Sequence, residues 1–97
     1  MYSLSTEASE DLDAILDYSI LNFGLDVMID YHSTLEDCFK SIEENPKLGI
    51  NIEYIQKDYL YFKHRSHLIF YKINEKGILI VRILHKSMDV SRHFNRD

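Results

Sequence analysis

The side chains that could carry out chemistry in this chain lie mainly in its second half. They are Lys63, His64, Arg65, His67, Arg82, His85, Lys86, Arg92 and His93. In-line cleavage of RNA needs a base near the 2′-hydroxyl, a cation for the phosphate charge and an acid for the leaving oxygen. Histidine, lysine, arginine and tyrosine can fill these roles. The composition of this cluster permits such chemistry without requiring it.

A metal centre is not expected among the five histidines. Tetrahedral zinc needs four converging ligands, whereas His64 and His67 offer only two, at a strand end and a turn. The single cysteine, Cys38, falls on an apolar helix stripe, which lacks the electropositive and partly exposed setting of a nucleophile. We therefore expect Cys38 to be a small core residue, and we expect neither a metal nor any other cofactor.

Motifs of the common enzyme classes are absent from the sequence. The chain has no glycine-rich phosphate loop, no dinucleotide-binding fingerprint and no Gly-x-Ser-x-Gly nucleophile elbow. Most common enzyme classes are excluded on this ground.

Arg82 and His85 stand in the most apolar segment, residues 78–85, which has the composition of a buried strand. Side chains alternate along a regular strand, so the two would point to opposite faces. A bulge near the strand end could bring them together. In the non-functional interpretation, Arg82 holds a local carboxylate such as Asp89, or a carboxylate of a partner.

The length and composition favour one packed domain over residues 1–97. Of the 97 residues, 45% are hydrophobic and 12% aromatic, which argues against disorder. One cysteine cannot form an intramolecular disulfide, and nothing at the N-terminus resembles a signal peptide or a membrane span. A cytoplasmic location is expected.

Charge is divided unevenly along the chain, whose net charge is −5. Residues 1–46 carry eleven acids against one lysine, and residues 47–97 carry ten bases against five acids. This division suggests that the basic half faces an acidic partner, either protein or nucleic acid. The alternative is two solvated faces of opposite sign.

Two amphipathic helices follow a short first strand at residues 2–5. Ser5 or Thr6 can cap the first helix, and Gly24 can end it as a left-handed C-cap. The second helix is predicted from about residue 25 to Glu44 and ends at Asn45-Pro46. The expected inward stripes are Ala8, Leu12, Ile15, Leu16, Ser19 and Phe23, and Met28, Tyr31, Leu35, Cys38, Phe39 and Ile42.

The second half reads as a β-meander. Residues 48–58 are expected to be mostly loop, followed by strands at 59–64, 67–73 and 78–85. Arg65-Ser66 forms the first tight connection, and the second turn has Gly77 with a positive φ. The predicted fold is α+β with the order β-α-α-β-β-β, in which a two-helix hairpin packs on one face of a mostly antiparallel sheet.

Two groups of residues form a pattern that spans nearly the whole chain. The first is Tyr2-Ser3-Leu4-Ser5 with Ala8, Asp11-Leu12, Ile15, Tyr18 and Phe23-Gly24. The second is Asn45-Pro46 with Gly49, His67 with Ile69-Phe70-Tyr71, and Arg82-Ile83-Leu84-His85 with Met88-Asp89 and Arg92-His93. This pattern resembles that of ParE-type toxins, most specifically in the run from Arg82 to His93.

The resemblance implies the RelE/ParE fold and the toxin role in a type II toxin–antitoxin module. Such a toxin binds DNA gyrase, stabilises its cleaved DNA complex, and has no recognised catalytic chemistry of its own. A ParD-like antitoxin would neutralise it and carry it to operator DNA in a higher-order complex. The toxin itself would bind neither specific DNA sequences nor membranes. The surface expected to contact target or antitoxin is Lys63, Arg65, His67, Arg82, His85, Met88, Asp89, Arg92 and His93.

Two alternatives stay open at this point. The related RelE branch consists of ribosome-dependent mRNA endoribonucleases, and here Arg65, Arg82 and His85 or His93 would be catalytic. The net charge of −5 fits RNA poorly, although the basic second half weakens this objection. The other alternative is an inactive or retargeted member whose only role is antitoxin binding.

Overall fold

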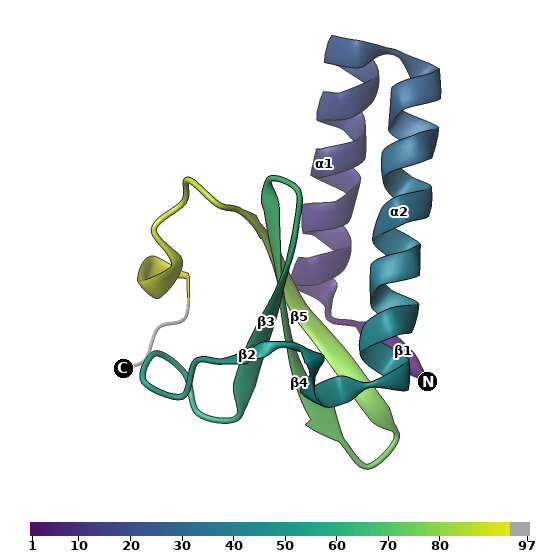
Figure 1. Ribbon diagram of the computed structural model, residues 1–97. Coiled ribbons are helices and arrows are strands. Elements are labelled where there is room, and N and C mark those ends of the chain that lie inside the picture. The colour runs from purple at the N-terminus through teal and green to yellow at the C-terminus, as the bar shows by residue number, and fades with distance from the viewer. Residues whose placement is uncertain (94–97) are drawn as a thin grey trace.

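A computed structural model shows two helices against a five-stranded sheet, and it describes residues 1–93 (Figure 1). The predicted domain end at residue 97 lies outside these residues. The helices are α1 (Thr6–Phe23) and α2 (Leu25–Glu44). The strands are β1 (Tyr2–Leu4), β2 (Ile50–Asn51), β3 (Tyr59–His64), β4 (His67–Asn74) and β5 (Gly77–His85), with short 3-10 turns η1 (Pro46–Leu48) and η2 (Val90–Arg92).

The sheet has the strand order β1-β5-β4-β3-β2. β1 lies parallel to β5, with Tyr2 opposite Ile78, and the other neighbours are antiparallel. Both helices cover one face of this sheet (Figure 1). The predicted α+β order is confirmed. The sequence reading omitted the short β2, which pairs with Leu60 and Tyr61.

Local sequence signals set the helix ends. Ser5 caps α1, because its Oγ accepts the N–H of Ala8 at 3.0 Å. Gly24 alone separates the two helices and has φ 92° and ψ 172°. The predicted positive φ is confirmed, but the ψ is extended, so the expected left-handed helical cap is wrong. This conformation lets the chain reverse within one residue.

The main core lies between the helices and the sheet, and its centre is Leu35, Phe39 and Ile42 of α2 against Ile69, Tyr71, Ile78, Ile80 and Ile83. Ala8 is buried on α1, and Leu12 and Ile15 pack at the edge of this core. Phe23 was expected on the same stripe but is 64% exposed. The hairpin projects past the sheet at this level, so no strand lies there to cover its ring (Figure 1).

A second apolar cluster occupies the opposite face of the sheet. Ile52, Phe70, Val81 and Leu84 are buried there, under Ile55 from the β2–β3 loop and Val90 from η2. The segment expected to be mostly loop therefore contributes a buried side chain, Ile52. Both faces of the sheet are consequently covered by the chain itself.

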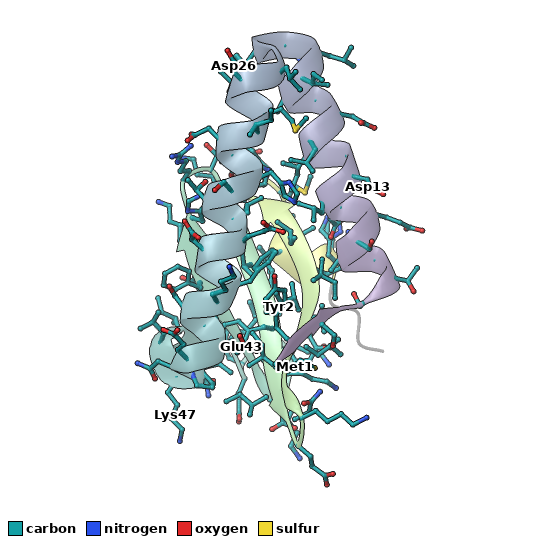
Figure 2. All side chains as sticks on the ribbon, turned by 90° about the vertical axis from the view of Figure 1, so that its right-hand side faces the viewer. Met1, Tyr2, Asp13, Asp26, Glu43 and Lys47 are labelled. Carbon is teal, nitrogen blue, oxygen red and sulfur yellow. The ribbon has the colours of Figure 1, made fainter. Side chains whose placement is uncertain are left out.

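The first residue is part of the fold. The ammonium group of Met1 forms an ion pair with Glu43 of α2, and the Met1 carbonyl accepts the N–H of Ile78 at 3.1 Å (Figure 2). Among residues 1–93, no helix has the length and apolar character needed to cross a membrane.

Candidate partner-binding site

Arg82 is held by the first helix. Its Nε and Nη2 donate to the two carboxylate oxygens of Asp11 at 2.8 and 2.9 Å. The same carboxylate accepts the N–H of Ile83 at 2.9 Å, just beyond the end of β1. The hydrogen bonds that Arg82 donates to Asp11 raise the pKa of Arg82 above its ordinary value, since they favour the charged guanidinium. The carboxylate that holds Arg82 is thus Asp11, and the expectation of Asp89 is wrong.

A bulge in β5 changes the direction of the side chains after it. Phe70 pairs with Arg82 and Tyr71 pairs with Ile80, so Val81 has no opposite residue on β4. Alternation resumes after the bulge. Arg82 pairs with Phe70 of the second apolar cluster, and His85 pairs with His67, which contacts α2. By register the two residues therefore lie on opposite faces, as predicted from the sequence. The guanidinium of Arg82 nevertheless reaches Asp11 of α1, whereas His85 packs on His67.

Three histidines line up across neighbouring strands at one end of the sheet. His64 of β3 lies opposite His67 of β4, which lies opposite His85 of β5. We call these three residues the histidine row. The rings of His67 and His85 meet edge to face, with their centroids 5.4 Å apart.

Helix α2 supplies the polar partners of this row. The Tyr31 hydroxyl is 2.6 Å from His67 Nδ1. Thr34 Oγ1 is 3.0 Å from His64 Nε2, and Cys38 Sγ is 3.2 Å from His64 Nδ1. Sequence reasoning missed these contacts, although the spacing of residues 31, 34 and 38 places them on one helix face.

The hydrogen bonds indicate which protons His64 carries. The Thr34 hydroxyl donates to the Tyr31 carbonyl at 3.0 Å, so its oxygen is left to accept from His64 Nε2–H. His64 Nδ1 then accepts the Cys38 thiol proton. The pKa of Cys38 is raised, mainly by burial and secondly by the negative charge of Asp37. The pKa of His64 is lowered, mainly by burial and secondly by the positive charge of Arg65. Both groups are neutral near pH 7, and Cys38 is not an activated nucleophile.

The end of the sheet beyond the histidine row is basic. Arg65 adopts φ 54° in the β3–β4 turn, lies over the Tyr31 ring at 5.5 Å and pairs with Asp30 at 3.6 Å. The N–H of Lys86 donates to the Ser66 carbonyl at 2.8 Å, which joins the end of β5 to this turn. Lys63 is exposed at the end of β3. We call Lys63, Arg65 and Lys86 the basic end.

The C-terminal part of the expected surface folds toward the far face of the sheet. Met88 and Asp89 are exposed, and Val90 packs into the second apolar cluster. Arg92 and His93 are exposed in and after η2. Among residues 1–93, no hydrogen bond or ion pair joins the four residues of the endoribonuclease alternative, Arg65, Arg82, His85 and His93. No group of three or more histidine, cysteine or acidic side chains in this range is arranged to hold a metal ion.

The family model of the ParE toxin of type II toxin–antitoxin systems, parDE, matches residues 2–90. The chain belongs to the ParE toxin family. The resemblance drawn from the sequence is therefore confirmed, and the protein is a ParE-type toxin of a type II toxin–antitoxin system.

Relatives of this ParE toxin match over almost their whole length. The toxin ParE1 of Caulobacter vibrioides is 34% identical over 92 residues, which cover 95% of each chain. The toxin ParE1 of Mycobacterium tuberculosis is 31% identical over 93 residues, with the same coverage. A solved chromosomal ParDE system from P. aeruginosa has a chain of the same fold, with a TM-score of 0.75 at 17% identity, over 87% of this chain and 92% of that chain.

Proposed function

We propose that this ParE-type toxin inhibits DNA gyrase by binding it and stabilising its cleaved DNA complex, without catalysis of its own. The observation that carries the proposal is the family match over residues 2–90. The ion pair of Arg82 with Asp11 supports the proposal, because a guanidinium whose Nε–Nη2 edge already binds a carboxylate is poorly placed to stabilise a reacting phosphate. A cytoplasmic location and a single domain over residues 1–97 are parts of this proposal.

We further propose that a ParD-like antitoxin neutralises the toxin through the basic end. Lys63, Arg65 and Lys86 lie together there, and an acidic antitoxin segment would meet them with opposite charge. His67, His85, Met88, Asp89, Arg92 and His93 complete the proposed contact surface. Arg82 takes a positioning role instead, since Asp11 already occupies it. Binding of operator DNA would belong to the antitoxin.

A cleavage assay tests the gyrase proposal. Purified toxin is incubated with gyrase and supercoiled plasmid, and the reaction is then treated with protease. Linear DNA that depends on the toxin, and that disappears when the antitoxin is added, is the expected result. Cleaved mRNA on programmed ribosomes, with gyrase unaffected, would instead establish the endoribonuclease alternative.

The antitoxin contact is tested separately by binding. Reversing the charge of the basic end with Lys63→Glu and Lys86→Glu should weaken the antitoxin complex by roughly tenfold or more, and added salt should weaken the unmodified complex. Lys57→Glu with Lys76→Glu, two exposed lysines in the β2–β3 loop and the β4–β5 turn, gives the same change of total charge and serves as the control. Equal affinity of all three proteins would contradict the proposed surface.

A further inference from the structure

The tip of the helical hairpin exposes a concentration of large apolar side chains. The hairpin tip comprises residues 18–29, where α1 ends and α2 begins, and it projects beyond the sheet (Figure 1). Its exposed apolar residues are Tyr18, Ile20, Leu21, Phe23, Leu25, Val27 and Ile29. Leu21 is 83% exposed and Phe23 is 64% exposed. Single apolar residues are common on protein surfaces, but so many large ones within one twelve-residue hairpin tip are typical of an interaction site.

This surface is ordered before any partner arrives. The Gly24 N–H donates to the Ile20 carbonyl, and the Gly24 carbonyl accepts the N–H of Met28, each at 3.1 Å. The rings of Tyr18 and Phe23 stack with an interplanar angle of 9° and centroids 6.3 Å apart. A partner would therefore bind a formed surface, with little ordering cost on the toxin side.

The acidic residues around the tip indicate what charge a binding partner should carry. Residues 1–39 contain nine acids and no lysine or arginine. Asp17 and Asp26 are exposed within or beside the tip, and Asp13 projects to solvent one turn below, as Figure 2 shows for Asp13 and Asp26. Two copies meeting tip to tip would bring like charges together, and an anionic membrane would be repelled. The complementary partner is positively charged.

We propose that the hairpin tip binds an amphipathic helix of another protein, whose apolar stripe is flanked by lysine and arginine. The apolar stripe covers Leu21, Phe23 and their neighbours, and the flanking cations meet Asp17 and Asp26. This surface is opposite in charge to the basic end, so the two surfaces take different partner segments. The inference holds whichever target the toxin inhibits.

A designed helix tests the chemistry directly. The probe is a synthetic amphipathic peptide of leucine and lysine, roughly 18 residues or five helical turns long, and its comparator replaces every lysine with glutamate. The leucine–lysine peptide should shift the amide NMR signals of residues 18–29 of the full chain and bind more weakly as salt is added. The leucine–glutamate peptide should produce no such shifts.

Matched variants distinguish specific binding at this site from nonspecific hydrophobic binding. Leu21→Ser with Phe23→Ser should lower affinity for the leucine–lysine peptide roughly tenfold or more while leaving the melting temperature unchanged, because both side chains are largely exposed. Asp17→Asn with Asp26→Asn should weaken binding and reduce its salt dependence. Tyr54→Ser removes an 84% exposed ring in the β2–β3 loop and should change nothing.

Three results would overturn the proposal. The first is equally tight binding of the leucine–lysine peptide to the Leu21/Phe23 double variant. The second is tight binding of the leucine–glutamate peptide. The third is a dimer of the unmodified chain in sedimentation that the double variant abolishes, since a second copy would then be the occupant.

Discussion

Arg82 and Asp11 are 71 positions apart in the chain and form a two-pronged ion pair with N–O distances of 2.8 and 2.9 Å. The pair joins the middle of β5 to the N-terminal half of α1, and Asp11 also caps the N–H of Ile83. β1 pairs with β5 only as far as Ile80, and beyond that point the carboxylate of Asp11 accepts a backbone N–H of β5 that a neighbouring strand would otherwise bind.

Loss of this pair should destabilise the fold. Arg82→Met leaves the Asp11 carboxylate partly buried without its cation, which should lower the free energy of unfolding by about 2 kcal/mol. The melting temperature should fall by roughly 10 °C. A double-mutant cycle with Asp11→Asn, followed by chemical denaturation, measures the coupling. If Arg82→Met kept full stability but lost toxicity, Arg82 would be a direct contact residue instead.

The histidine row should make stability depend on pH. The pKa of His67 is lowered, mainly by burial and secondly by His85 and His64. The pKa of His64 is lowered, mainly by burial and secondly by Arg65. Both folded-state pKa values thus lie below the ordinary 6.5, so the unfolded chain binds more protons as the pH falls through this range. Stability should be complete above about pH 7 and decline progressively below pH 6.5.

Urea unfolding between pH 5 and pH 8 measures this decline. The groups facing His67 are Tyr31 from α2 and His64 and His85 from the neighbouring strands. His67→Gln should reduce the slope of stability against pH, whereas the exposed His93→Gln should keep it. An unchanged slope in His67→Gln would show that the row does not govern the acid response.

Cys38 should react slowly while the protein is folded. Its pKa is raised, first by burial and then by Asp37, so little thiolate is present near pH 7.5. Alkylation by iodoacetamide, followed by mass spectrometry, should be roughly tenfold slower in the native protein than in urea. Faster reaction in the native protein would mean that His64 withdraws the thiol proton and activates the sulfur.

Gly77 should tolerate no side chain. It has φ 133°, and a Cβ there would lie 2.0 Å from the Met1 carbonyl oxygen, so Gly77→Ala should cost more than about 2 kcal/mol of stability. Gly24→Ala is the matched control, because Gly24 also has a positive φ, of 92°, but has no atom within 4 Å of the added methyl group. Its cost should be about 1 kcal/mol, and denaturant unfolding compares the two. Equal costs would mean that backbone strain alone, and not the Met1 contact, sets the penalty.

Local signals made the helices and turns predictable. Ser5, Gly24 and Asn45-Pro46 set helix boundaries through contacts within a few residues, and the predicted ends at Phe23 and Glu44 are confirmed. The turn at residues 74–77 was predictable for the same reason, because Gly77 permits a positive φ. Such signals need no knowledge of distant parts of the chain.

The candidate site was less predictable, because it depends on contacts between distant segments. The alternation pattern could not reveal the bulge at Val81, which puts Ile83 on the same face as Ile78 and Ile80 and puts Leu84 on the opposite face. No local pattern pairs Arg82 with Asp11 or Cys38 with His64. Phe23 fits the helical stripe but lies where the sheet no longer covers it, and the length of the hairpin relative to the sheet was not available from periodicity.

The pairing of β1 with β5 has a consequence for synthesis of the chain. Tyr2 to Leu4, made first, find their partners Ile78 to Ile80 only near the end of translation, whereas the α1–α2 hairpin closes on itself much earlier. The entropy cost of closing so long a loop must be met before the β1–β5 contacts can stabilise the fold. Pairing of β1 with β5 should therefore come late in folding. During translation the α1–α2 hairpin can therefore form before the sheet, and most of the chain must be translated before the complete fold can form.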